Sequence, residues 1–98
     1  MATFISLVSL TQQGIRDFKD SPDRAATFKS MAEKVGVKIK DVYWTMGVHD
    51  VVLILEAPDD ETVTAAMLGL GSLGNVRTQT LRAFNSSEMK EIISNVPS

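Results

Sequence analysis

The sequence predicts an α+β fold in which a four-stranded antiparallel sheet carries two helices, and a further helix follows at the C-terminus. Two patterns predict it. Apolar residues alternate or run together over four short segments, as in strands, and they recur three and four positions apart over three others, as in helices. The segments follow one another in the order β-α-β-β-α-β-α. A chain of 98 residues is of the size of one domain, residues 1–98.

The first strand is expected over residues 2–10, and the first helix begins near Ser21. We interpret Ser21 as the N-cap because Pro22 follows at the first helical position, where proline is favoured. An apolar stripe at helical spacing then consists of Phe28, Met31, Ala32 and Val35. Gly36 comes directly after this stripe, as is typical of a helix C-terminus.

A hairpin is expected over residues 37–55. The first strand spans residues 37–46, and a change of phase near Asp41 predicts a β-bulge. Gly47 and Val48 match a two-residue turn with glycine first, which is typical of type II′ hairpins. Residues 51–55 are apolar on both faces, and this predicts a central strand that is covered on both sides.

The second helix is expected to begin at Asp59 or Asp60, within an acidic run that suits a helix N-terminus. Its apolar stripe is Val63, Ala66, Met67 and Leu70. The last strand is more polar and covers residues 75–84. Its arginines, Arg77 and Arg82, fit either contact with an anionic ligand or simple solvation at a sheet edge.

Asn85 and Glu88 match a capping box at the start of the terminal helix. Apolar residues follow at helical spacing: Met89, Ile92, Ile93 and Val96. A helix of this length is marginal in isolation, so we expect it to dock on another surface and to contribute stability.

The order β-α-β-β-α-β is the split βαβ or ferredoxin-like arrangement. Its two main helices can cover only one face of the sheet, whereas the strand at residues 51–55 calls for cover on both. The terminal helix would cover part of the second face, and the sheet of a second subunit would cover it more completely. The sequence therefore predicts a homodimer.

Residues 69–74 read GLGSLG, which matches the G-x-G-x-x-G string of dinucleotide-binding proteins. In those proteins the string follows a strand and opens a helix, so that phosphate meets the helix N-terminus. Here the string ends a helix and leads into a strand, where the helix dipole has the wrong sign. We expect these glycines to terminate the helix, and we expect no nicotinamide, flavin or other cofactor.

Composition argues against several classes of protein. The net charge is −2 and the Lys and Arg residues are scattered, so no basic surface for nucleic acid is expected. The absence of cysteine excludes a thiolate nucleophile and a thiolate metal site, and a single histidine argues against a transition-metal centre. The apolar N-terminus lacks a basic region and a cleavage pattern, so we expect a cytoplasmic protein without a membrane anchor.

The residues best suited to chemistry lie around the hairpin. His49 is the only histidine, and its pKa range suits a general acid or base. Asp50 adjoins it, but neighbouring strand residues point to opposite faces, so adjacency alone does not make them a dyad. Tyr43 and Trp44 also lie on opposite faces, where either could line a ligand pocket. Plainer interpretations remain open for all four: an exposed turn histidine, a carboxylate bonded to amides, and packing aromatics.

Three stretches of the chain resemble the GYD domain family: ATFISLVSLTQQGIRDFKDSPDR, YWTMGVHDVVLILEAPDDE and LGSLGNVRTQTLRAF. The resemblance covers residues 2–95. It implies a relationship to the dimeric α+β barrels, in which two ferredoxin-like subunits stack sheet on sheet. The family is named for a Gly, Tyr, Asp motif after the second strand. Gly47 and Asp50 correspond to its glycine and aspartate, and His49 stands at the tyrosine position.

Three functions stay open at this point. The first is a homodimeric module that binds a small molecule through Tyr43, Trp44, His49 and Asp50, and the lack of a recognisable catalytic constellation favours it. The second is a cofactor-free enzyme with His49 as acid or base, by analogy with monooxygenases and isomerases of the wider superfamily. The third is a regulatory or assembly module that acts with a separate partner.

Overall fold

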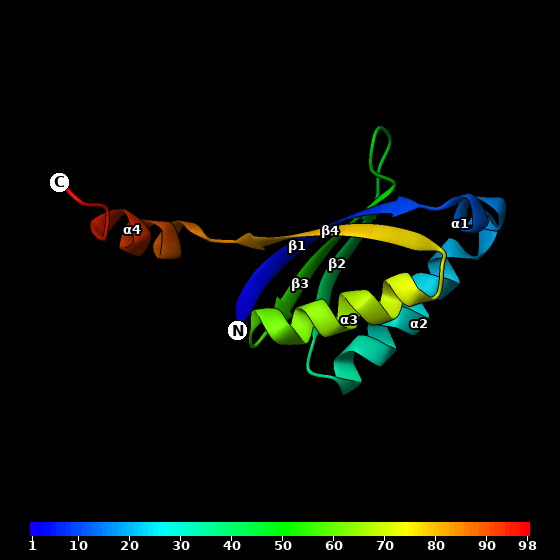
Figure 1. The fold of residues 1–98 in the computed structure, drawn as a ribbon, viewed down its shortest axis with the longest axis horizontal. Helices are drawn as coiled ribbons and strands as arrows, with labels where there is room; N and C mark the ends of the chain where they lie inside the picture. The colour runs from blue at the N-terminus through cyan, green and yellow to red at the C-terminus, as the bar shows by residue number, and fades with distance from the viewer.

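The computed structural model describes residues 1–98, and its main elements follow the predicted order (Figure 1). The first half consists of β1 (Ala2–Leu10), α1 (Gln12–Arg16), a 3-10 turn (Phe18–Asp20), α2 (Ser21–Lys34) and β2 (Lys38–Trp44). The second half consists of β3 (Val51–Ala57), α3 (Asp60–Ser72), β4 (Val76–Ala83) and α4 (Ser86–Ser94). Helix α1 and the 3-10 turn lie where the sequence predicts only a polar connection.

The strands form one antiparallel sheet in the order β2-β3-β1-β4. The central strands β1 and β3 pair along their length, with Val8 opposite Val51 at one end. The predicted bulge is present in β2, whose register against β3 shifts between Ile39 and Asp41. This strand order is that of the ferredoxin-like arrangement, so the α+β class and the four-stranded sheet are confirmed.

Helices α2 and α3 lie against the same face of the sheet (Figure 1). The side chains buried beneath them come from alternate strand positions, as expected where one face of a sheet is covered. They include Phe4, Ser6 and Val8 on β1 and Val51, Leu53, Leu55 and Ala57 on β3. Ser6 is the polar member of this core, and its hydroxyl lies 3.1 Å from the hydroxyl of Thr80.

The other face of the sheet carries no helix (Figure 1). At its centre Ile5 and Leu7 of β1 lie opposite Ile54 and Val52 of β3, and Leu81 of β4 lies opposite Ile5. We call these five residues the open sheet face. Four of them are half-buried and Leu81 is exposed. The strand predicted to be covered on both sides is therefore covered on one side only within a single chain.

Helix α4 extends away from the sheet beyond the end of β4 (Figure 1). The predicted capping box is confirmed: the Asn85 side chain accepts the amide of Glu88 at 2.8 Å, and the Glu88 carboxylate accepts the amide of Asn85 at 3.0 Å. Arg82 fixes the same turn to the sheet, because it donates to Glu88 at 3.3 Å and to the carbonyl of Thr3 at 3.1 Å. Arg82 is therefore not simply solvated, the plainer of the two interpretations from the sequence.

The docking expected of α4 does not occur within the chain. The apolar side chains expected to dock remain between 37% and 64% exposed: Met89, Ile92 and Ile93 on α4, and Val96 just beyond its C-cap. We call these four residues the α4 stripe. Because β4 is extended and Arg82 bonds to Glu88 in the first turn of α4, the helix continues away from the sheet and the stripe stays exposed.

Two details of the sequence prediction are wrong. Ser21 is the first residue of α2 rather than its N-cap, because the 3-10 turn leads directly into the helix and Asp20 already has helical backbone angles, φ −86° and ψ −5°. The hairpin turn is longer than two residues. Strand β2 ends at Trp44 and β3 begins at Val51, and a hydrogen bond of 2.9 Å from the Thr45 amide to the Asp50 carbonyl closes a wider loop.

The glycine string lies where the sequence predicts it. Residues 69–72 form the end of α3, and Gly74 follows with φ +85°, so the string terminates a helix before β4. Gly14, by contrast, has a role that no motif announces. A Cβ atom at Gly14 would lie 2.0 Å from the carbonyl oxygen of Asn75, so only glycine allows α1 to approach the start of β4 this closely.

Candidate functional site

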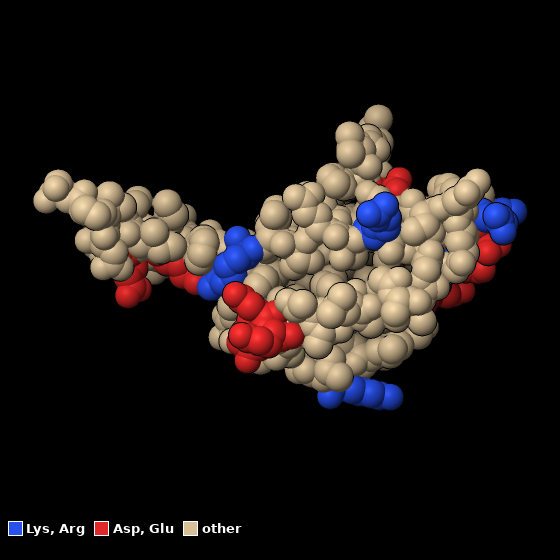
Figure 2. Space-filling view, in the orientation of Figure 1, with Lys and Arg blue, Asp and Glu red and all other residues tan.

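The loop between β2 and β3 projects from the body of the protein, and we call residues 45–50 the hairpin loop (Figure 1). Gly47 has φ +109°, a value that L side chains rarely adopt, so glycine is required there for the turn. The tip presents two apolar side chains to solvent, Met46 at 97% exposure and Val48 at 88%. Figure 2 shows this tip without charged side chains.

Asp50 fastens the base of the hairpin loop to β1. Its amide donates to the carbonyl of Val8 at 2.8 Å, and its carboxylate accepts the amide of Leu10 at 2.7 Å. The carbonyls of His49 and Asp50 both accept hydrogen bonds from Thr45 instead. The carboxylate therefore replaces a main-chain carbonyl as the acceptor for Leu10 just before the start of β3, which gives the motif aspartate a structural role.

His49 is half-buried beside the end of β1. Its Nδ1 lies 3.4 Å from the hydroxyl of Ser9, a long hydrogen bond in which the tautomer decides which atom donates. No carboxylate contacts the ring, because the oxygens of Asp50 face Leu10. The arrangement offers a titratable group near the hairpin loop, without the orienting partner that acid–base catalysis usually employs.

Tyr43 and Trp44 lie on opposite faces of β2, as predicted. Tyr43 is opposite Val52 on the uncovered side of the sheet and is exposed. Trp44 lies on the side of the helices, where its indole N–H donates to the hydroxyl of Ser21 at 3.0 Å. The structure thus does not bring Tyr43, Trp44, His49 and Asp50 into one cavity.

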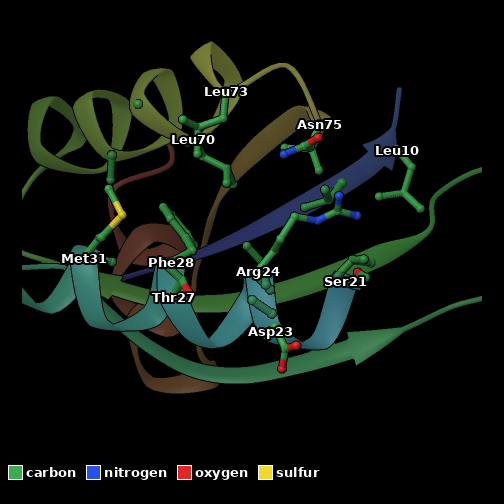
Figure 3. Close-up of a pocket in the computed structure, with 18 of the residues that line it drawn as sticks. Leu10, Ser21, Asp23, Arg24, Thr27, Phe28, Met31, Leu70, Leu73 and Asn75 are labelled. Atoms are coloured by element: carbon green, nitrogen blue, oxygen red, sulfur yellow. The ribbon is translucent and has the colours of Figure 1, made fainter. Parts of the chain in front are cut away.

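A groove separates α2 from α3 on the covered side of the sheet, and Trp44 is the only one of those four that lines it (Figure 3). Its volume is about 560 Å³. Phe28 and Met31 reach into it from α2, and Leu70 and Leu73 reach into it from α3. We call this space the α2–α3 groove. Its floor is formed by strand residues that include Val8, Leu10, Val51 and Leu53.

Small side chains explain why the two helices do not close over this space. The lining includes Ala65, Ala66 and Gly69 on α3 and Ala25 and Ala32 on α2. A Cβ atom at Gly69 would meet nothing within 4 Å. The groove was not predicted from the sequence, although alanines and a glycine at facing helix positions are a signal that could have indicated it.

Three polar side chains at the Leu10 end of the groove already have partners. Ser21 accepts the indole N–H of Trp44, and Arg24 donates to the carbonyl of Gly14 at 3.1 Å. The side chain of Asn75 accepts a hydrogen bond of 3.0 Å from Gln13. Most of the remaining lining is apolar, and Met31, Val35 and Leu73 on the rim are exposed. The groove is therefore chiefly an apolar surface.

The displaced pKa values belong to helix caps. The Thr62 hydroxyl, and then the Thr62 amide, lower the pKa of the Asp59 carboxyl at the start of α3, where Figure 2 shows an acidic cluster. The Asn85 amide is the main cause that lowers the pKa of Glu88. Side chains of His, Asp and Glu form no group of three suited to a metal ion. None of the helices has the length and apolar character needed to cross a membrane.

These features define an α+β protein that displays apolar surfaces on a projecting loop, an open sheet face and a terminal helix. The chain belongs to the GYD domain family, whose model matches residues 4–93. It is 37% identical over 90 residues to the "Glutamine synthetase and cystathionine beta-lyase binding protein" of Thermus thermophilus. That match covers 91% of this chain and 95% of the relative.

A solved structure has the same fold. The crystal structure of TTHA0845 from Thermus thermophilus matches with a TM-score of 0.57 and 24% sequence identity, and the match covers 88% of this chain and 96% of that one. The likeness supports the ferredoxin-like architecture of the chain.

Proposed function

We propose that this protein is a homodimeric regulatory or assembly module that binds a separate protein partner. The observation that carries the proposal is the relative named as a binding protein for two enzymes, which this chain matches over 91% of its own length at 37% identity. The family model covers residues 4–93, which contain the hairpin loop, the open sheet face and the groove. The proposal thus favours a protein partner over a small molecule.

The hairpin loop is the surface that we assign to the partner. Met46 and Val48 are almost fully exposed at its tip, and methionine is common at surfaces that adapt to a protein partner. The base of the loop is held by bonds of Asp50 to Val8 and Leu10, so the tip is presented on a fixed support. A fixed loop loses less conformational entropy on binding than a mobile one.

The homodimer part of the proposal rests on the open sheet face. Ile5, Leu7, Val52 and Ile54 form a contiguous apolar centre on a side of the sheet that no helix covers. Two sheets packed face to face would bury this centre from both copies, and self-complementary contacts of this kind are usual in two-fold dimers. Lys40 and Glu56 form an ion pair of 3.8 Å beside this apolar centre.

Small-molecule binding is the second candidate function, and the volume of the α2–α3 groove favours it, because ligand pockets commonly measure about 300–1,000 Å³. Specific pockets also need a few polar groups that converge on the ligand. In this groove Ser21, Arg24 and Asn75 already bond to the protein itself. The other polar side chains of the lining, Asp20, Asp23 and Thr27, all come from the α2 side. We therefore rank this function below partner binding.

The test of partner binding uses purified glutamine synthetase and cystathionine β-lyase from the organism that encodes this chain. The 98-residue chain is immobilised for biolayer interferometry. We expect at least one of the two enzymes to bind. The double substitution Met46→Ser and Val48→Ser should weaken binding at least tenfold, since apolar anchors at an interface centre often carry roughly 1.4 kcal/mol or more.

The matched control is Leu68→Ser, which removes an apolar side chain of 70% exposure from the outer side of α3. It should bind as the unchanged chain does. Equal binding by the hairpin-loop variant would reject the loop as the contact surface, and no binding by either enzyme would reject the proposed function.

A further inference from the structure

The outer edge of β4 is a row of backbone groups without partners. This strand comes last in the order β2-β3-β1-β4, so only one of its two edges pairs with β1. The Thr11 amide donates to the carbonyl of Asn75, just before β4, which makes these opposed residues a hydrogen-bonded pair. Such pairs occur at every second position of an antiparallel ladder. The backbone groups that point outward along β4 therefore belong to Val76, Thr78, Thr80 and Arg82.

The two edges of the sheet differ in their protection against another strand. The β2 edge is interrupted by the bulge after Ile39 and carries Lys38 and Lys40. Bulges and lysines are features by which proteins prevent pairing at an edge. Strand β4 has neither, and it keeps an unbroken register with β1 over its eight residues. Helix α4 continues beyond the end of β4 and does not pair with this edge (Figure 1).

We propose that the β4 edge pairs antiparallel with the β4 edge of a second copy of this chain, about a two-fold axis at Gln79. In this register each outward amide and carbonyl of the strand has a partner, because Val76 pairs with Arg82 and Thr78 pairs with Thr80 of the second copy. A shift of two residues in either direction leaves Val76 or Arg82 without a strand residue opposite. The β4 edge is therefore complementary to itself in one register.

The side chains fit the same register. Opposed residues of antiparallel strands point to the same side of a sheet, and β4 alternates between half-buried and exposed positions. On the side of the helices Thr78 lies opposite Thr80, a pair that stabilises strands. On the exposed side Arg77 lies opposite Leu81. Arg82 lies opposite Val76, so no arginine faces another and the repulsion between like charges is avoided.

This contact goes beyond the proposed homodimer and does not depend on it. The homodimer uses the open sheet face, whereas the β4 contact uses only the edge of the sheet. A two-fold axis perpendicular to the sheet keeps α2 and α3 of both copies on one side and both open sheet faces on the other. Both contacts can therefore form at once, and together they would give a tetramer with closed symmetry.

The absence of cysteine allows a test by disulfide cross-linking. Gln79→Cys lies at the proposed axis, in a non-hydrogen-bonded pair whose Cα atoms are about 4.5 Å apart, which a disulfide can span. Leu81→Cys is the matched control, since Leu81 is equally exposed on the same side of β4 but would lie at least about 13 Å from its copy. Gln79→Cys should give at least fivefold more cross-linked dimer under gentle oxidation.

A mixture of Arg77→Cys and Leu81→Cys chains tests the register itself, because these residues lie opposite each other in the proposed pair. The mixture should give cross-linked product at least fivefold above that of Leu81→Cys alone. Equal yields from Gln79→Cys and Leu81→Cys would overturn the inference, as would the absence of product from Gln79→Cys.

Thr78→Pro, added to the Gln79→Cys chain, tests whether backbone pairing drives the contact. Proline at this position removes an outward amide and leaves the bonds between β4 and β1 in place. It should lower the cross-linked product at least fivefold, whereas Thr78→Val should not, and circular dichroism checks that both variants fold. An unchanged yield from a folded proline variant would refute pairing through the edge.

Ile54→Lys separates this inference from the proposed homodimer, because it places a charge in the open sheet face. The yield of Gln79→Cys should be the same with and without Ile54→Lys. Loss of product would mean that the cross-link reports face-to-face packing and would reject the edge contact. If copies do not cross-link but Thr78→Pro weakens binding to either enzyme, the edge receives a strand of the enzyme and the inference is wrong.

Discussion

Replacing Asp50 with alanine tests whether the aspartate of the family motif is a structural residue. Its carboxylate accepts the Leu10 amide at 2.7 Å, and the nearby carbonyls of His49 and Asp50 are engaged by Thr45. Alanine therefore leaves the Leu10 amide without its acceptor. The loop base would lose one of the two hydrogen bonds that Asp50 makes to β1.

The expected cost follows from the kind of hydrogen bond that is lost. A hydrogen bond to a charged group contributes about 1.5–3 kcal/mol, and partial exposure of this site places Asp50→Ala near the lower end. A loss of about 1.5 kcal/mol lowers the melting temperature of a domain of this size by roughly 6–12 °C. Asp50→Asn keeps an uncharged acceptor at the same place, so its loss of stability should be less than half of the loss in Asp50→Ala.

Urea titration followed by circular dichroism and by the fluorescence of Trp44, the only tryptophan, measures these differences. All variants are compared at one protomer concentration, because self-association makes apparent stability depend on concentration. If Asp50→Ala unfolds at the same urea concentration as the unchanged chain, the carboxylate is not the acceptor that β1 needs. If Asp50→Asn lowers the free energy of unfolding as much as Asp50→Ala does, the site requires negative charge rather than a hydrogen-bond acceptor.

Three further outcomes are expected. Gly14→Ala should destabilise the protein by roughly 1–3 kcal/mol, because its Cβ would lie 2.0 Å from a carbonyl oxygen. Gly71→Ala, within α3 and with nothing within 4 Å, should in urea titration be at least as stable as the unchanged chain, because alanine favours the helix. Acid should loosen α4, because the pKa of Glu88 is lowered in the folded protein. The stability that the Glu88 carboxylate contributes is complete above the ordinary glutamate pKa of about 4.3 and is lost as pH falls through the folded-state pKa. Amide exchange across α4 that is unaltered by acid would contradict this. His49→Tyr should keep its melting temperature, since the ring makes only one long hydrogen bond, to Ser9.

Much of the fold could be predicted because periodicity reports burial directly. Alternation on β1 and β3 and the stripe on α3 correspond to buried or half-buried positions, and the capping box of α4 depends on residues three positions apart. The stripe on α2 is half right: Phe28 and Ala32 are buried, whereas Met31 and Val35 are exposed on the groove rim. Gly36 and Gly74 mark helix ends with positive φ, as their positions predicted. Signals of this kind are local, and sequence carries them well.

The parts that could not be predicted depend on contacts between distant residues. The width of the hairpin loop is set partly by Asp50, which bonds to a strand 40 positions earlier. The glycine at position 14 is required by Asn75, which lies 61 positions later. The α2–α3 groove depends on small residues from two helices that face each other only after folding. No single window of the sequence contains both members of any of these contacts.

The motif at the hairpin separates into fixed and variable positions when each residue is traced to its contacts. Gly47 is required by its backbone angle and Asp50 by the amide of Leu10, so both serve the support of the loop. His49 has the weakest structural constraint of the three, with one hydrogen bond of 3.4 Å. If the loop binds a partner, as we propose, this position can change from tyrosine to histidine without loss of the fold. It is then the position at which partner preference can be tuned, beside the exposed side chain of Val48.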